Sequence, residues 1–303
     1  MAGLHPENDH PRAPDDYSRA FAIGIALNLG FVVIQAYYGW VAGSLALLAD
    51  AAHNLGDVAA LLLAWVAALA ARRPGSLQRT WGWHRATLLA AFANAAALLV
   101  AMGVLGWEAL QRLAEPQPVA ATTVIVVAAI GIVVNGATAM LFLRGRKRDL
   151  NIRAAFVHLV GDALVSLGVV VAGVLTLLYG WTWVDPVAGL AISVVIVLGT
   201  WGLLRQSTHL LFDGVPQGID LREVERELAA LPGVGQVSDL HVWATGTTHN
   251  VLSAHLVVPG HAPGDDFYRN AAARLHERFD IDHVTLQVTR APAAFACREP
   301  LRR

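Results

Sequence analysis

Two histidine–aspartate pairs stand inside strongly apolar stretches of the chain. His53 and Asp57 are four residues apart, and so are His158 and Asp162. Residues at i and i+4 lie on one face of an α-helix, one turn apart. If the two helices met, two imidazoles and two carboxylates would converge, which is a ligand set suited to tetrahedral Zn²⁺. The pairs therefore predict one metal site built by two helices.

The surroundings of the pairs favour a functional role, because an ionisable side chain in hydrocarbon is costly without a partner or a purpose. Gly56 and Gly161 precede the two aspartates, where a missing side chain lets another helix approach. Unrelated polar contacts between helices are the alternative. Asp50, one turn before His53, is expected either to line the ion path or relay protons, or to hold helices together by hydrogen bonds.

Six apolar segments are each long enough to cross a bilayer, which takes about 20 residues at 1.5 Å rise per residue. Hydrophobic residues make up 55% of the chain and charged ones only 15%, which is typical of an integral membrane protein. Asn28, Gln35, Asn94 and Asn135 fall in these segments and are expected to line a cavity or to form packing bonds. The predicted spans are residues 19–41, 45–71, 86–107, 120–143, 154–179 and 185–204.

Basic residues cluster in the second and fourth connections between spans, residues 72–85 and 144–153. Lys and Arg accumulate on the cytoplasmic side, so both termini are predicted to be cytoplasmic in a multi-pass protein of a bacterial-type inner membrane. Residues 1–17 are polar and are expected to form a disordered cytoplasmic tail. Residues 18–205 would then form the transport domain.

The character of the sequence changes after residue 205. Helical and alternating patterns predict an α-β-β-α-β order within residues 206–290, a small cytoplasmic α+β domain with helices on one face of a sheet. Residues 291–303 are expected to be a tail. The tail holds the single cysteine, Cys297, which excludes an intrachain disulfide and a cysteine-built zinc cluster. No basic stripe is present, so nucleic acid is not an expected partner.

The stretch from Gly43 to Asp57, the pair His158/Asp162, the six spans and the C-terminal domain together resemble the cation diffusion facilitator family. The resemblance implies a homodimeric metal/proton antiporter with a ferredoxin-like cytoplasmic domain. It implies that Zn²⁺ is the transported substrate, without an organic cofactor, and that the two pairs form the transport site. Two histidines with two aspartates resemble the zinc-preferring branch.

Other positions depart from the family pattern or leave its roles open. Residues 144–149 contain no histidine, so a metal-buffering loop is absent, and Thr87 stands where Glu is usual. His84 is expected to bind an incoming ion, or to belong to an interfacial loop anchored by tryptophans. His255 and His283 fall where some members place regulatory ligands, with His241 and His249 as possible partners. Hydrogen-bonded strand histidines are the alternative.

The proposed mechanism is alternating access, in which lipid-embedded helices carry the ion and protons return. Metal binding needs neutral imidazole and ionised carboxylate, so protons compete with the metal. With an ordinary pKa near 6.5, histidine changes charge close to cytoplasmic pH. Efflux of Zn²⁺, and of Cd²⁺, Co²⁺ or other divalent cations, driven by an inward proton gradient is therefore predicted. A membrane-embedded zinc metalloenzyme and a membrane-anchored cytoplasmic metal sensor are the alternatives.

One difficulty follows from the predicted spans. His53 lies about eight residues from the outer end of its span, whereas His158 lies only four residues from the inner end of its own. The pairs would then differ in depth by several ångströms. Either the fifth span begins deeper in the membrane, below a water-filled cavity, or its boundary is wrong by a turn; the cavity is preferred because an ion needs a wet route.

Overall fold

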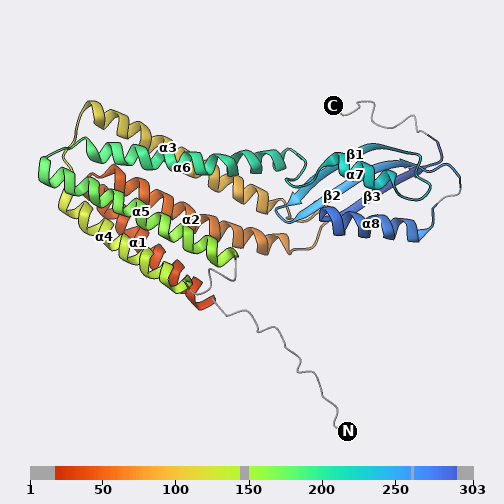
Figure 1. Cartoon of the computed structure of the whole chain (residues 1–303), viewed down its shortest axis with the longest axis horizontal. Helices are drawn as coiled ribbons and strands as arrows, with labels where there is room; N and C mark the ends of the chain where they lie inside the picture. The colour runs from red at the N-terminus through yellow and green to blue at the C-terminus, as the bar shows by residue number, and fades with distance from the viewer. Residues whose placement is uncertain (1–17, 144–149, 261–262, 292–303) are drawn as a thin grey trace, which may run out of the picture. The chain divides into compact units, whose positions relative to one another are not determined.

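The computed structural model describes residues 18–143, 150–260 and 263–291. The tails predicted at 1–17 and 291–303, except Ala291, and residues 144–149 lie outside the described residues. The order of elements is visible in Figure 1. The long helices are α1 (Ser18–Ala42), α2 (Leu45–Ala71), α3 (Ala86–Ala114), α4 (Ala121–Phe142), α5 (Leu150–Tyr179) and α6 (Val184–Leu211). They are followed by α7 (Leu221–Ala229), β1 (Gln236–Gly246), β2 (His249–Val257), α8 (Asp265–Phe279) and β3 (Ile281–Thr289).

The prediction of six spans is confirmed. By length and composition, α2 to α6 are able to cross a membrane, and α1 contributes the shorter apolar stretch Ala26–Val41. Three helices extend beyond the predicted spans: α3 continues to Ala114, α6 continues to Leu211 and α5 begins at Leu150. The thickness of hydrocarbon limits the apolar part of a helix but not the helix itself, so polar turns extend these helices beyond the predicted spans.

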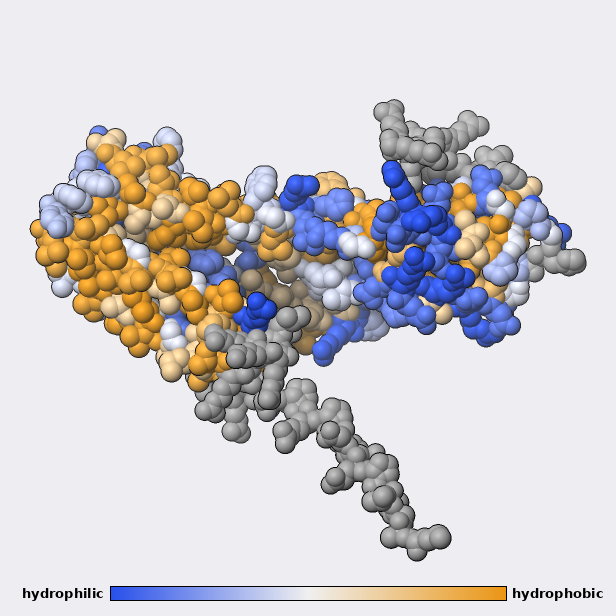
Figure 2. Space-filling model, viewed as in Figure 1, coloured by the Kyte–Doolittle hydropathy of each residue, from blue (hydrophilic) through white to orange (hydrophobic). Residues whose placement is uncertain are grey.

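Large apolar side chains cover the outside of the long helices. Trp40 is 74% exposed and Leu198 is 72% exposed, and Figure 2 shows hydrophobic surface over these helices and hydrophilic surface over the C-terminal domain. A soluble protein rarely exposes so large an apolar surface, whereas lipid accommodates it. Between α1, α2, α4 and α5 the helices bury their own core, which includes Phe31, Leu47, Val124 and Val169.

Three connections meet at one end of α1, α2, α4 and α5. Gly43 has a φ of +66°, the left-handed conformation that ends α1 and lets α2 begin two residues later. The N–H of Ala120, just before α4, donates to the carbonyl of Ala42 over 3.0 Å. The N–H of Leu45 donates to Asp185 Oδ2, at the start of α6, over 2.7 Å. We call this end, marked by Gly43, Ala120 and Asp185, the turn end.

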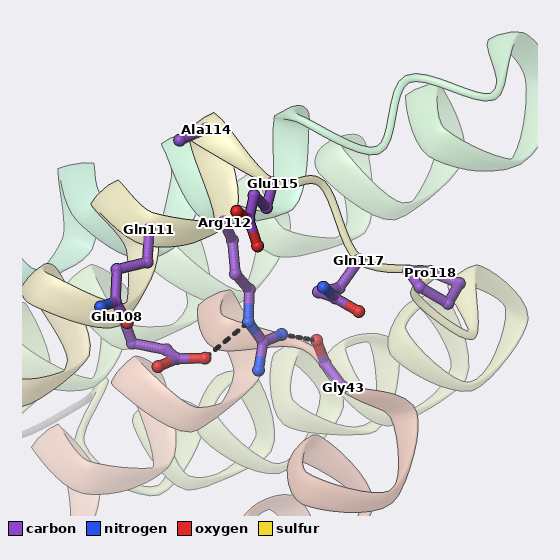
Figure 3. Close-up of a pocket in the computed structure, with 8 residues that line it drawn as sticks. All are labelled: Gly43, Glu108, Gln111, Arg112, Ala114, Glu115, Gln117 and Pro118. Atoms are coloured by element: carbon purple, nitrogen blue, oxygen red, sulfur yellow. Dashed lines mark hydrogen bonds and ion pairs between the residues drawn. The ribbon is translucent and has the colours of Figure 1, made fainter.

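Charged side chains brace the turn end. The Asp185 carboxylate also accepts a hydrogen bond from Ser44 Oγ. Asp185 thus caps the start of α2, where the first N–H groups have no partner within the helix, from another helix. Arg112 donates to the carbonyl of Gly43 and, over 3.0 Å, to Glu108 (Figure 3). These bonds fix the start of α2, the helix that carries His53. The cavity in Figure 3, about 640 Å³, is lined by Gly43, Glu108, Gln111, Arg112, Ala114, Glu115, Gln117 and Pro118.

The C-terminal domain is a three-stranded mixed sheet with two helices. The strand order is β1-β2-β3, with β1 antiparallel and β3 parallel to β2. The parallel pair requires a crossover, and α8 supplies it. A common core joins both helices to the sheet, including Val224, Leu228, Leu252, Leu256 and Leu275. The predicted α-β-β-α-β order is confirmed; within the described residues it corresponds to a ferredoxin-like β-α-β-β-α-β order without the first strand.

Candidate metal site in helices α2 and α5

Helices α2 and α5 bring the two predicted pairs together. His158 Nε2 lies 3.1 Å from Asp57 Oδ2 and 3.6 Å from Asp162 Oδ2. His53 Nε2 lies 3.7 Å from Asp57 Oδ2 and 3.6 Å from Asp162 Oδ1. The four groups therefore alternate, with each imidazole between two carboxylates of opposite helices. The sequence spacing alone predicted each i, i+4 pair, and the contact between α2 and α5 brings the two pairs into one site.

The separations match the edge of a zinc-sized coordination sphere. Ligand atoms about 2.0–2.1 Å from a tetrahedral zinc ion lie about 3.3 Å from one another. The observed nitrogen-to-oxygen distances, 3.1 to 3.7 Å, bracket that value. Candidate ligand atoms of His53, His158 and Asp162 all lie within 4.8 Å of each other. Small side-chain movements would close these atoms around one ion.

The site is buried on one side and open on the other. The Asp162 side chain is only 6% exposed, whereas the His158 side chain is 48% exposed. His53 and Asp57 lie between these extremes. Because α5 begins at Leu150, His158 stands eight residues inside its helix, not four as predicted. The helix therefore continues further before His158 than predicted, and the open side agrees with a wet approach to the site.

A second polar group lies one helical turn from the site, toward the turn end. Asp50 accepts hydrogen bonds from Gln35 Nε2 at 2.6 Å, Ser166 Oγ at 3.2 Å and Asn54 Nδ2 at 3.4 Å. Asn54 also donates to Gln35 Oε1 at 3.5 Å. All of these residues are buried. We call Gln35, Asp50, Asn54 and Ser166 the Asp50 cluster; it joins α1, α2 and α5 by hydrogen bonds.

Sequence reasoning did not single out Ser166, although its position four residues after Asp162 puts it on the same face of α5. The expected close approach at Gly161 was wrong, since an added Cβ there would meet nothing within 4 Å. Close approach occurs at Gly131 of α4, where a Cβ would lie 2.8 Å from Phe31 Cζ and 3.0 Å from Ser166 Oγ. A glycine near a polar pair therefore does not by itself mark the contact.

His84 lies outside this site, in the connection between α2 and α3. Its ring packs edge-on against the ring of His249, with centroids 5.0 Å apart. Trp81 of the same connection packs edge-on against His283, with centroids 4.9 Å apart. Thr87 Oγ1 accepts a hydrogen bond from the N–H of Thr247 at 3.0 Å. The connection therefore contacts the sheet domain by aromatic and hydrogen-bonding contacts, which the sequence did not predict.

The strand histidines are divided, since His249 and His283 both pack against Trp81, whereas His255 and His241 are bonded elsewhere. His255 is buried, and its two ring nitrogens contact Ser238 Oγ at 3.1 Å and Thr289 Oγ1 at 2.8 Å. His241 is exposed and contacts Asp239 at 3.1 Å. In the sheet, His255 pairs with Gln287, whereas His283 pairs with Val251. This arrangement favours hydrogen-bonded strand histidines over a shared regulatory site.

One further group of candidate metal ligands was not predicted from the sequence. His276, Asp280 and Asp282 place ligand atoms within 4.8 Å of each other on the exposed surface of the domain. Asp282 also accepts the N–H of Asn250 at 2.9 Å, and Asp280 ends α8 in the left-handed conformation. These bonds give the two carboxyl residues structural roles.

The architecture and the site define a class of cation transporters. Residues 21–212 match the family model described as the cation efflux transmembrane domain, and residues 216–291 match the one described as the cation efflux protein, cytoplasmic domain. The chain belongs to the cation diffusion facilitator family, as its sequence motifs predicted. It is therefore a multi-pass membrane transporter for metal cations and not an enzyme.

Similar proteins match most of the length of the chain. Zinc transporter ZitB of Escherichia coli (strain K12) is 35% identical over 96% of this chain and 94% of its own. The metal cation efflux system protein CzcD of Cupriavidus metallidurans is 35% identical over 96% of this chain and 91% of its own. A cadmium, cobalt and zinc/H(+)-K(+) antiporter of Bacillus subtilis is 32% identical over 89% of this chain and 88% of its own.

Proposed function

We propose that the protein exports Zn²⁺ across the membrane in exchange for protons, through a site formed by His53, Asp57, His158 and Asp162. The observation that carries the proposal is the alternation of two imidazoles and two carboxylates at 3.1 to 3.7 Å. Two nitrogen and two oxygen donors form a complete four-coordinate set, as suits an ion that is carried rather than one that activates water.

The same donors explain proton coupling. Zinc binds the unprotonated imidazole and the ionised carboxylate, so each proton bound at the site opposes the metal. Histidine titrates near neutral pH, which lets a gradient across the membrane reload the site with protons after the metal leaves. Cadmium and cobalt, named for the Bacillus subtilis relative, have the same charge and accept nitrogen and oxygen donors, so we include them as weaker substrates.

The asymmetry of the site supports a state that is open to the cytoplasm. On the turn-end side, the Asp50 cluster is buried and hydrogen-bonded. On the opposite side, the side chains of His158 and Asp57 are 48% and 35% exposed. The basic connection 72–85 supports a cytoplasmic location for that opposite side. Alternating access would then close this side and open the turn end.

The remaining topology belongs to the same proposal. Both termini are cytoplasmic, residues 18–205 carry the transport path, and residues 206–290 form the cytoplasmic domain. The protein acts as a homodimer, in keeping with the family. Lipid, divalent cations and protons are its partners.

Zinc uptake into proteoliposomes under an imposed pH gradient tests the proposal. We expect uptake by the unchanged protein into vesicles that are acidic inside, provided that the cytoplasmic side faces outward, and its loss when an uncoupler dissipates the gradient. Asp162→Ala and His53→Ala should abolish uptake while folding normally. His241→Ala, an exposed histidine of the sheet domain, is the matched control and should transport fully. Undiminished gradient-driven uptake by Asp162→Ala would refute the assignment.

A further inference from the structure

Buried polar atoms without partners occur in three of the long helices, and one of these atoms belongs to the proposed transport site. Among the described residues, four buried side-chain atoms have no hydrogen-bond partner: Asn28 Oδ1, His53 Nδ1, and both Oδ1 and Nδ2 of Asn135. Asn135 is completely buried in α4. Buried polar groups are nearly always paired, since an unpaired one forfeits its bonds to water without replacement. An asparagine with neither atom paired therefore calls for a functional explanation.

The packing of α4 on α5 places Asn135 in the layer of the site. Gly131 of α4 faces Ser166 of α5, because a Cβ added at Gly131 would lie 3.0 Å from Ser166 Oγ. Asn135 follows Gly131 by four residues, and Asp162 precedes Ser166 by four. Helices α4 and α5 run in opposite directions. The step from Gly131 to Asn135 and the step from Ser166 to Asp162 therefore both lead one helical turn away from the turn end, and each stays on the side of its helix that faces the other helix. Asn135 and Asp162 thus share one layer.

His53 belongs to this layer as well. It follows Asp50, the hydrogen-bond partner of Ser166, by three residues, and its Nε2 lies 3.6 Å from Asp162 Oδ1. Because Nε2 faces the two carboxylates, it is the atom that would bind metal, and Nδ1 must then carry the proton of the neutral ring. That N–H is buried and lacks an acceptor. Among the described residues, the ion-pair partners of the Asp162 carboxylate are the two imidazoles, each at 3.6 Å.

An asparagine side chain offers an acceptor for the Nδ1–H of His53 and a donor for the Asp162 carboxylate. Its carbonyl oxygen accepts hydrogen bonds and its amide donates two. We propose that Asn135 is a positioning residue for the transport site: through ordered water, its carboxamide oxygen accepts from the Nδ1–H of His53 and its amide donates to Asp162. The proposal rests on the proposed function, since it takes His53 and Asp162 as metal ligands. Bonds of this kind fix the tautomer and orientation of a ligating histidine, and their loss weakens metal binding about 10- to 100-fold.

Zinc affinity and thermal unfolding of the purified full chain at pH 7.5 test the role of Asn135. Asn135→Leu keeps similar bulk and removes both polar atoms; we expect zinc affinity to fall about 10- to 100-fold. Its unfolding temperature should stay the same or rise, because no bond is lost and an unpaired group is removed. Asn135→Ser, whose hydroxyl both donates and accepts, should retain zinc affinity within about threefold. Thr138→Val is the matched control on α4, because Thr138 is buried but already bonded to the carbonyl of Val134.

Each outcome decides for or against the inference. Wild-type zinc affinity in Asn135→Leu overturns it, and so does an equal loss in Asn135→Leu and Asn135→Ser, or in Thr138→Val. If Asn135→Leu does not fold, Asn135→Ala carries the same expectation, and failure of both to fold assigns Asn135 a structural role instead. The variant His53→Ala distinguishes a failure of the proposed transport site from a failure of the positioning role of Asn135. Normal zinc binding by His53→Ala refutes the transport site itself, whereas its loss beside normal binding by Asn135→Leu refutes only the positioning role.

Discussion

Replacement of Asp50 separates the two roles that the sequence left open for this residue, proton relay and helix packing. The carboxylate is fully buried and accepts from Gln35 at 2.6 Å, Ser166 at 3.2 Å and Asn54 at 3.4 Å. Asp50→Leu would leave these donors without their acceptor. A buried unpaired donor costs about 1–3 kcal/mol.

The three donors do not contribute equally to that cost. Ser166 can turn its hydroxyl to a carbonyl one turn earlier in α5, and Asn54 keeps its contact with Gln35 Oε1 at 3.5 Å. The Gln35 amide therefore dominates, and we expect a total loss of about 3 kcal/mol. For a unit of about 150–250 residues this corresponds to a melting temperature lower by about 6–12 °C.

Asp50→Asn keeps the shape and an acceptor for Gln35 but cannot carry a proton between pH 5 and 8. If Asp50 holds helices together, Asp50→Asn should melt within about 3 °C of the unchanged protein and should transport zinc under a pH gradient. Thermal unfolding in detergent and uptake into proteoliposomes measure both properties. Ser193→Ala, which removes a buried hydroxyl bonded only within α6, is the control for loss of a single hydroxyl.

The packing explanation is refuted by one specific pattern. Asp50→Asn would be folded and would bind zinc with normal affinity, yet gradient-driven uptake would be lost. That pattern would assign the carboxyl group a proton-carrying role in spite of its saturated hydrogen bonds.

Three other outcomes follow from the structure. Lowering the pH from 7.5 to 5.5 should weaken zinc binding about tenfold or more, since protons compete with the metal for both imidazoles; titration calorimetry that shows a constant affinity would contradict this. Asp185→Ala should destabilise the protein by about 1–2 kcal/mol through loss of the cap on α2, visible as a lower melting temperature, whereas Asp185→Asn should lose less; equal melting of all three proteins would contradict it. His255→Asn should leave the number of bound zinc ions per chain unchanged, because both ring nitrogens already contact hydroxyls; a count lower by one would show that His255 binds metal.

The sequence predicted the elements well where the physical constraint is strong. A helix that crosses the hydrocarbon needs about 20 mostly apolar residues, so α2 was predicted at its observed bounds, Leu45–Ala71. The i, i+4 spacing gave the shared face of His53 and Asp57. Alternating and helical patterns gave the order of the C-terminal elements. Each of these features depends on local sequence alone.

Features that depend on contacts between distant segments were not predictable in this way. Helix ends beyond the apolar stretch, as at Leu150, have no constraint from lipid. The close packing at Gly131 depends on the shape of Phe31 and Ser166 in other helices. The approach of Trp81 to His283 joins residues far apart in the chain. In each case the sequence shows the residue type, but tertiary packing determines which distant residue it contacts.

The two-residue link at the turn end restricts how the transporter can move. Gly43 and Ser44 alone connect α1 to α2. Ser44 forms a hydrogen bond with Asp185 of α6, and Gly43 forms one with Arg112 of α3. The adjoining ends of α1 and α2 are therefore tied to each other and to α3 and α6. If the proposed transport cycle moves His53 outward, either α1 moves with it or the hydrogen bonds of Asp185 to the start of α2 break.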